Sequence, residues 1–199
     1  MNMIKQFGMA SLLAVALFFV ACSQSPEGQQ VDAGDAEDIS AVSAADTLNV
    51  NIENSSIKWI GTEPGDEGHY GDMKVKSGMI LVNDGQIEGG SFVIDMESIN
   101  VMDLEGGRKT KLEGHLKDGD FFETNNYPEA SFTIASVSAK ENDSTANFLI
   151  KGNLQMKDST KSIEFPAQNE MTENGLTAIT PQFTIDRTQW GVMYRSSED

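Results

Sequence analysis

Apolar and polar residues alternate along most of the chain from Thr47 onward. In residues 147–157, the apolar residues Phe148, Ile150, Leu154 and Met156 occupy even positions, whereas most odd positions are polar. A period of two is typical of a β-strand with one buried face. Since parallel strands are buried on both faces and lose this alternation, the pattern predicts an antiparallel sheet. The same alternation recurs at Leu48–Ile52, Ile57–Trp59, Phe92–Met96, Phe132–Ile134, Ile163–Phe165 and Phe183–Ile185.

Turn-forming residues separate several of these runs. Asp84–Gly85 lies between the run 79–82 and the strand around Phe92, and Asn174–Gly175 separates Phe165 from Ile179. Both dipeptides tolerate the positive φ angles of tight reverse turns. Lys157–Thr160 is a third candidate turn. The sequence therefore predicts hairpins at these places.

The stretch from Asp103 to Lys117 departs from the alternation. Leu112 and Leu116 are four residues apart among basic side chains, which indicates a short amphipathic helix with Asp103 as its N-cap. With about eight strands, one helix and no internal repeat, the chain is expected to be an all-β domain, either a closed barrel or a sandwich. An eight-stranded barrel is either filled by its own side chains or holds one small ligand.

The first 21 residues have the order of a secretory signal. Lys5 precedes the 12-residue apolar run Met9–Val20, which is too short to span about 30 Å of hydrocarbon. We therefore predict a signal peptide over residues 1–21. Cys22, the only cysteine, follows in Phe19–Ser23, which resembles the lipobox of bacterial lipoproteins although Phe19 replaces the usual Leu. This resemblance predicts a lipidated Cys22; the alternative is a small buried hydrophobe.

Residues 22–46 are predicted to form an acidic, disordered tether. Six acids and no Lys or Arg lie between Ser23 and Asp46, and the remaining residues are mostly small or polar. Such a composition cannot build a core, so we expect an extended segment that holds the domain 47–199 away from the bilayer.

Charge and cysteine content exclude other classes of protein. The net charge of -17 repels phosphate backbones, which excludes nucleic-acid binding. A single cysteine forms no intrachain disulfide, and the sequence has no Cys/His cluster for zinc. His69 and His115 are 46 positions apart, so neither a metal site nor a cofactor is expected.

Several motifs together carry a resemblance. They are His115–Lys117, Asp120–Glu123, Tyr127–Phe132, Gly90–Phe92 with Ser98–Ile99, Gly152–Lys157 with Thr160–Lys161, and Phe183–Gly191. This arrangement resembles the YceI-like family of bacterial lipid-binding proteins over roughly residues 47–196. The family often carries His in its first strands, whereas this chain has Trp59–Thr62 there and His69 later.

The resemblance implies a fold and a function. It implies an extended, lipocalin-like antiparallel β-barrel of eight strands whose interior holds a polyisoprenoid or another long-chain lipid without catalysis. With the leader, it places the protein in the bacterial cell envelope, anchored through Cys22 and facing the periplasm or the exterior. The residues expected to line the ligand are Trp59, Phe92, Ile94, Phe121, Phe132, Ile134, Phe148, Ile150, Phe183, Ile185, Arg187 and Trp190.

Arg187 has two interpretations. Alternation with Phe183 and Ile185 turns Arg187 inward at the end of a strand, where a guanidinium needs an anionic partner. That partner is either a nearby acid, in a structural ion pair, or the polar head of the lipid, held bidentately by the planar guanidinium.

Two other functions are considered. An envelope lipoprotein with a filled barrel would act as a protein-interaction or stress-protection module through an exposed apolar patch. A hydrolase would need a pair of carboxylates, for which Asp118, Asp120 and Glu123 are candidates. A chain with 31 acids offers such pairs by accident, so catalysis is the weaker of the two.

Overall fold

The computed structural model describes residues 28–40, 46–62, 68–140, 145–173 and 175–194. The predicted signal peptide, 1–21, and Cys22 lie outside these residues. In chain order the elements are β1 (Gln29–Gln30), β2 (Asp46–Asn49), η1 (Ile52–Asn54), β3 (Ser56–Gly61), β4 (His69–Asn83), β5 (Gln86–Val101), α1 (Gly106–Lys117), β6 (Glu129–Ala139), β7 (Phe148–Met156), β8 (Ser159–Thr172), β9 (Gly175–Ile179), β10 (Phe183–Thr184) and η2 (Arg187–Trp190).

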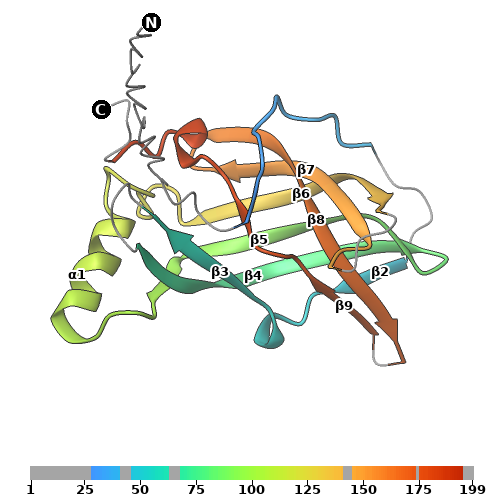
Figure 1. The fold of residues 1–199 in the computed structure, drawn as a ribbon, viewed down its shortest axis with the longest axis horizontal. Coiled ribbons are helices and arrows are strands. Elements are labelled where there is room, and N and C mark those ends of the chain that lie inside the picture. Colours follow the sequence, from blue (N-terminus) through green and yellow to red (C-terminus); the bar gives the residue numbers. More distant parts are fainter. Residues whose placement is uncertain (1–27, 41–45, 63–67, 141–144, 174, 195–199) are drawn as a thin grey trace, which may run out of the picture.

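One curled antiparallel sheet forms most of the molecule (Figure 1). Its strand order is β2-β4-β5-β6-β7-β8-β9, and β3 also pairs with β4. Within the described residues, β2 and β9 do not pair with each other, so the curl is a half-barrel. The structure thus confirms the predicted all-β antiparallel fold with one short helix.

Tight turns join the long strands where the sequence predicts them. Asp84 and Gly85 connect β4 to β5 with φ angles of 48° and 79°, the positive values that this hairpin turn requires. Lys157, with φ of 53°, begins the turn between β7 and β8. Thr172 pairs with Gly175 across the β8–β9 hairpin. These local signals therefore predict three hairpins correctly, β4–β5, β7–β8 and β8–β9.

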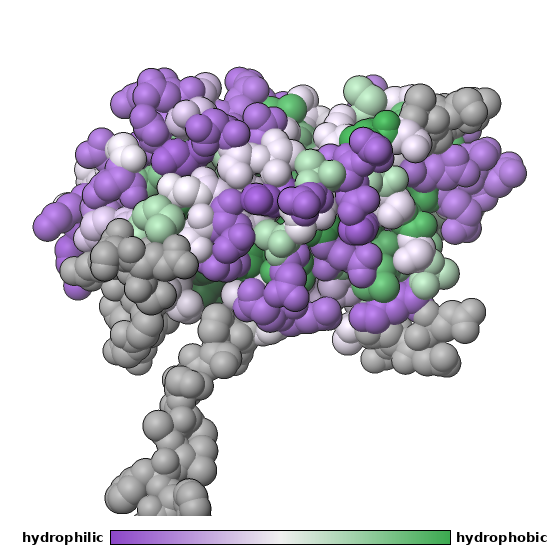
Figure 2. All heavy atoms as spheres, turned by 90° about the horizontal axis from the view of Figure 1, so that it is seen from above, coloured by the Kyte–Doolittle hydropathy of each residue, from purple (hydrophilic) through white to green (hydrophobic). Residues whose placement is uncertain are grey.

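The interior contains two groups of apolar side chains. The first surrounds Phe132, Phe165 and Trp190, and the second surrounds Val101 and Leu116 near the helix. Met156 packs against both groups, so the apolar interior is continuous along the curl. Seen from above, the surface is largely hydrophilic, with hydrophobic side chains visible in the gaps (Figure 2).

Helix α1 lies at one end of the sheet and begins later than predicted (Figure 1). Its N-cap is Glu105, because Asp103 instead lies with Oδ2 2.6 Å from Nδ1 of His69 and accepts a hydrogen bond from the Tyr70 N–H. The predicted cap is therefore wrong, since a long-range contact takes the carboxylate. Among the described residues, no helix has the length and hydropathy to cross a membrane.

Residues 28–40 are packed against the sheet, which corrects part of the predicted disordered tether 22–46. We call this segment the N-terminal strap. Its β1 pairs in parallel with β10, and Val31 is buried in the first apolar group with Ala33 against it. Gly34 bridges to Ser162 of β8 through two main-chain hydrogen bonds. The apolar pair Val31 and Ala33, two positions apart, overrides the acidic composition around it.

Candidate functional site

The structure brings most of the predicted ligand-lining residues into the interior of the half-barrel. Seven belong to the first apolar group and three to the second, and the latter are nearer the helix. The former are Phe92, Phe132, Ile134, Ile150, Phe183, Ile185 and Trp190, and the latter are Trp59, Ile94 and Phe121. Phe148, at the start of β7, and Arg187 are members of neither group.

A row of phenylalanine rings crosses the middle of the interior. The centroid of Phe165 lies 5.3 Å from that of Phe132 and 4.7 Å from that of Phe183. The rings of Phe165 and Phe183 are stacked, at an interplanar angle of 9°. Phe165 was not predicted as a site residue, although the alternation Ile163–Phe165 marks it as inward-facing. The row joins the sheet to the C-terminal segment by apolar contact alone.

The apolar interior is unevenly covered. Phe132, Ile134 and Ile150 are buried, whereas Phe92 and Phe183 are only half-buried. Trp59 and Ile94 of the second group are also half-buried. Accessible aromatic and aliphatic surface thus remains on the inner side of the curled sheet, and such surface suits an apolar ligand.

The C-terminal segment covers the curl of the sheet. Figure 1 shows the chain after β9 running across the curl to η2. Phe183 of β10 stacks on Phe165, and the fully buried Trp190 donates from Nε1 to the Leu154 carbonyl at 2.9 Å. Because β1 pairs with β10, the strap and the C-terminal segment form this cover together.

Arg187 holds the end of the described chain. It is the first residue of η2 and not, as predicted, part of a strand. Its guanidinium donates hydrogen bonds to the carbonyls of Val192 and Tyr194 and lies 5.0 Å from the centroid of the Phe121 ring. Within the described part of the chain, the bonded partners are main-chain carbonyls and not the carboxylate of the predicted ion pair.

Aromatic rings close the end of the interior beside α1. His115 lies in the last turn of α1, with its ring centroid 4.3 Å from that of Tyr194 and 5.7 Å from that of Phe121. Its Nε2 is buried, has no hydrogen-bond partner among the described residues, and lies 4.0 Å from Oδ2 of Asp120. His115 is thus part of an end wall made mainly of rings.

The candidate catalytic carboxylates make structural contacts. Asp118 accepts a hydrogen bond from the Gly119 N–H, and Glu123 accepts one from Asn126 and lies 3.6 Å from Nζ of Lys157. Together with Asp120 beside His115, they surround the turns after α1. In the described ranges, no group of three or more His, Cys, Asp or Glu side chains could hold a metal ion.

Two carboxyl groups have shifted pKa values. Burial raises the pKa of Asp103, but hydrogen bonds from His69 and the Tyr70 N–H outweigh it, so the pKa is below its ordinary value. Hydrogen bonds from Thr188 lower the pKa of Asp186, which caps η2. Both shifts favour the charged form and arise from structural contacts, a long-range one for Asp103 and a helix cap for Asp186.

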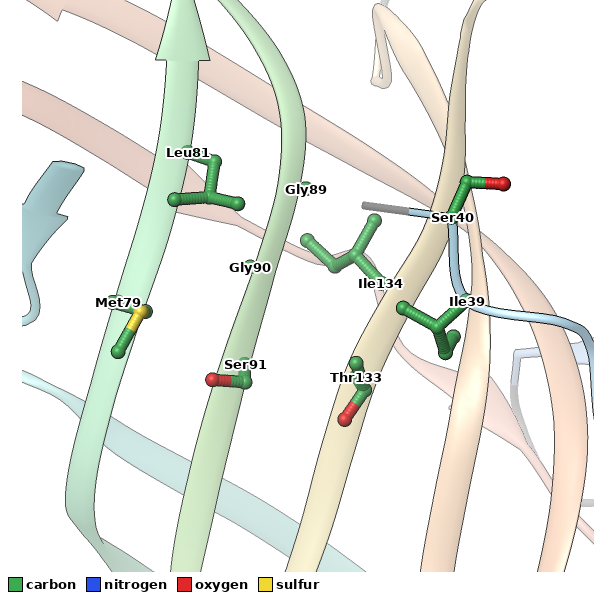
Figure 3. Close-up of a pocket in the computed structure, with 9 residues that line it drawn as sticks. All are labelled: Ile39, Ser40, Met79, Leu81, Gly89, Gly90, Ser91, Thr133 and Ile134. Carbon is green, nitrogen blue, oxygen red and sulfur yellow. The ribbon is translucent and has the colours of Figure 1, made fainter. Parts of the chain in front are cut away.

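A separate hollow lies between the strap and strands β4, β5 and β6 (Figure 3). Its volume is about 150 Å³, and it is lined by Met79, Leu81, Gly89, Gly90, Ser91, Thr133 and Ile134 of the sheet with Ile39 and Ser40 of the strap. Of the predicted ligand-lining residues, Ile134 alone contributes to it. Ligand pockets usually measure about 300 Å³ or more, so this hollow is too small for a long lipid chain.

A comparison with protein families identifies one family for this chain. The family model described as the YceI-like domain matches residues 35–199, which begin within the strap and include every strand of the main sheet. Among curated proteins, none matches the chain. A solved structure of BcnA from Burkholderia cenocepacia is 16% identical, with a TM-score of 0.46 over 69% of this chain and 79% of that chain. A YceI protein from Campylobacter jejuni is 15% identical, with a TM-score of 0.41 over 82% and 81% of the two chains.

Proposed function

The chain belongs to the YceI-like family, whose domain spans residues 35–199, and from this premise we propose that its half-barrel binds a long-chain lipid. The ligand is an isoprenoid or another amphiphilic lipid, and the protein holds it without catalysing a reaction. One observation carries the proposal: an apolar interior runs without a break from the end wall at α1 to the cover at β10, with Met156 joining its two groups.

The energetics suit a long apolar chain. Each methylene that moves from water into an apolar interior contributes about 0.8 kcal/mol. The half-buried side chains of Phe92, Ile94 and Phe183 offer that environment. The contact between Phe165 and Phe183 is a ring stack without hydrogen bonds, so a lipid chain can replace one ring against the other at little polar cost.

The lipid content of the purified protein tests this function. Protein purified without detergent exchange is extracted with organic solvent, and the extract is analysed by mass spectrometry. A long-chain lipid in near-stoichiometric amount is the expected result. Phe183→Ala, which removes one ring of the stack, should lower the amount several-fold, whereas Phe148→Ala, outside both apolar groups, is the matched control and should retain it. A wild-type extract without lipid would contradict the proposal.

Envelope anchoring is the second part of the proposal. Several acyl chains on Cys22 would hold the protein on a membrane stably, whereas a single chain gives marginal binding. Cys22→Ala should therefore move the protein from the detergent phase to the aqueous phase in a partition assay, while Ser25→Ala should not. If the Cys22→Ala protein stays in the detergent phase, the anchor lies elsewhere.

A protein-interaction function has one observation in its favour. Ile60 of β3, Tyr70 of β4 and Met102, directly after β5, lie next to one another, because Ile60 pairs with Tyr70 and the Met102 N–H donates to the Tyr70 carbonyl. Their side chains are 55%, 52% and 55% exposed. Neighbouring exposed apolar side chains of this size are typical of contact surfaces. A lipid-free interior would favour this second function.

A further inference from the structure

The strap shortens the distance between Cys22 and the folded domain. The composition predicts a free tether up to residue 46, yet Gln29 and Gln30 of the strap already pair with Phe183 and Thr184 of β10. Five residues therefore separate Cys22 from Gly28, where the described chain begins. Since an extended chain spans at most about 3.6 Å per residue, these residues reach no more than about 20 Å.

Contacts along the strap prevent it from acting as a longer spacer. Val31 is buried in the first apolar group, and Gly34 is bonded to Ser162. Further along, the Glu37 N–H donates to Oδ1 of Asn153, Nδ2 of Asn153 donates to the Glu37 carbonyl, and Nζ of Lys151 lies 2.5 Å from Oε1 of Glu37. A pull on Cys22 is thus resisted at several points, and the attachment point stays beside β10.

The two segments that meet at this attachment point contain no charged residue, and the exposed Asp32 and Asp186 directly follow them. Residues 28–31 and 179–185 contain no Asp, Glu, Lys or Arg, although the whole chain has a net charge of -17. Exposed residues here include Gln29 and Gln30, and Ile179 has 64% of its surface exposed. Anionic lipid head groups repel carboxylates, so a neutral face with an exposed apolar side chain tolerates contact with a bilayer better than the acidic parts of the surface do.

We infer that the face formed by β1 and β10 rests against the bilayer in which Cys22 is anchored, and that lipid enters the half-barrel on this face. The inference rests on the proposed function, including the acylation of Cys22. A lipid that leaves the bilayer here meets Phe183 and Ile185 first and reaches the ring row without crossing water. Transfer through water would cost about 0.8 kcal/mol for each exposed methylene, which favours this direct path.

Fluorescence quenching by membrane-embedded nitroxide lipids tests the orientation. When Cys22 is acylated, an introduced cysteine is the only free thiol, because the chain has a single natural cysteine. Thr180→Cys places a fluorophore on the neutral face, two residues before Gln182, whose main chain lies against Gly28. Thr160→Cys is the matched control. Thr160 is exposed and pairs with the exposed Gln155, so both side chains lie on the face of the sheet opposite to that of the buried Leu154.

The full-length acylated protein is reconstituted in vesicles that contain phosphatidylethanolamine, phosphatidylglycerol and the nitroxide lipid. Quenching should be several-fold stronger at position 180 than at position 160. A flexible Gly/Ser insertion of 15 residues between Ser25 and Pro26 should bring the two values close together and slow the uptake of lipid from the same membrane several-fold.

The outcomes separate this inference from the proposed function. Equal quenching at the two positions in the protein with its natural spacing would overturn the inference while leaving lipid binding intact. An unmodified Cys22 in the intact mass would overturn it at its premise. Stronger quenching at position 180, together with a lipid-free extract, would support the orientation and contradict the proposed function.

Discussion

Arg187 connects the C-terminal segment that covers the half-barrel to the aromatic end wall beside α1. Its planar guanidinium reaches the carbonyls of Val192 and Tyr194 at once and stacks on Phe121. This geometry leaves Val192 fully buried and places the Tyr194 ring 4.3 Å from that of His115. The positive charge thus stabilises the C-terminal segment, and this structural role is the one we expect mutation to reveal.

Replacing Arg187 with Lys keeps the charge but loses the second donor and the flat stacking surface. The free energy of unfolding should fall by about 1–2 kcal/mol, because one carbonyl loses its charged partner. Lipid retention in the folded fraction should not change. Chemical denaturation and lipid extraction check the two parts, with Arg108→Lys on the exposed side of α1 as the control. Loss of lipid without loss of stability would instead favour a head-group clamp.

Asp186 stabilises the first turn of η2 through its charged form. Its pKa is lowered by hydrogen bonds from Thr188, so its contribution to stability is complete above the ordinary pKa of about 4 and is lost as the pH falls through the lower, folded-state pKa. Asp186→Ala should cost about 1 kcal/mol at pH 7, as loss of a cap does, and the difference from wild type should shrink at low pH. Urea unfolding at pH 7 and pH 3 measures both. Asp38→Ala, exposed on the strap, should change stability little at either pH.

The elements that the sequence predicts best are those specified by neighbouring residues. The β4–β5 and β7–β8 hairpins follow from alternation and turn chemistry, both of which act within a few residues. The start of α1 was predicted two residues too early at its cap, because His69, 34 positions away, binds the Asp103 carboxylate. Local sequence patterns contain no information about a partner that only the folded structure brings near.

Glycines within the strands allow rings to pack on the backbone. A Cβ at Gly152 of β7 would lie 2.4 Å from the Thr133 carbonyl oxygen and 2.5 Å from Cζ of Phe132. A glycine in a strand often marks such a close approach. The alternation predicts this strand correctly, but Gly152 interrupts its inner apolar row so that the Phe132 ring can lie across it.

Two Gly→Ala substitutions should have opposite effects. Gly152→Ala meets main-chain oxygen on one side, so overpacking should lower the free energy of unfolding by about 1–3 kcal/mol. Gly114→Ala, within α1 with open space around its Cβ position, should raise it by about 0.5–1 kcal/mol through helix propensity. Thermal and chemical denaturation of both variants check this. A neutral Gly152→Ala would show that the ring does not pack on β7 as described.

At the scale of the whole molecule, the sequence predicts the fold class and most of the interior, but not how the interior is covered. Alternation places Phe92, Phe132 and Phe183 correctly on inner faces. The strap is not predicted, because its composition is acidic and its strand β1 pairs with a strand more than 150 positions away. The position of Arg187 was also missed, since alternation stops where β10 ends and η2 begins. Both incorrect predictions concern the cover of the half-barrel, which forms from segments at the two ends of the chain.

The central claim is that the interior, rather than the outer surface, receives the lipid. Photocrosslinking with an isoprenyl lipid that carries a diazirine near the end of its chain tests it most directly. The claim predicts labelled peptides that contain Phe92, Phe183 and Ile185, with labelling suppressed by excess unmodified lipid and lowered in Phe183→Ala. Labelling confined to the exposed patch of Ile60, Tyr70 and Met102, with the interior peptides unmodified, would contradict it.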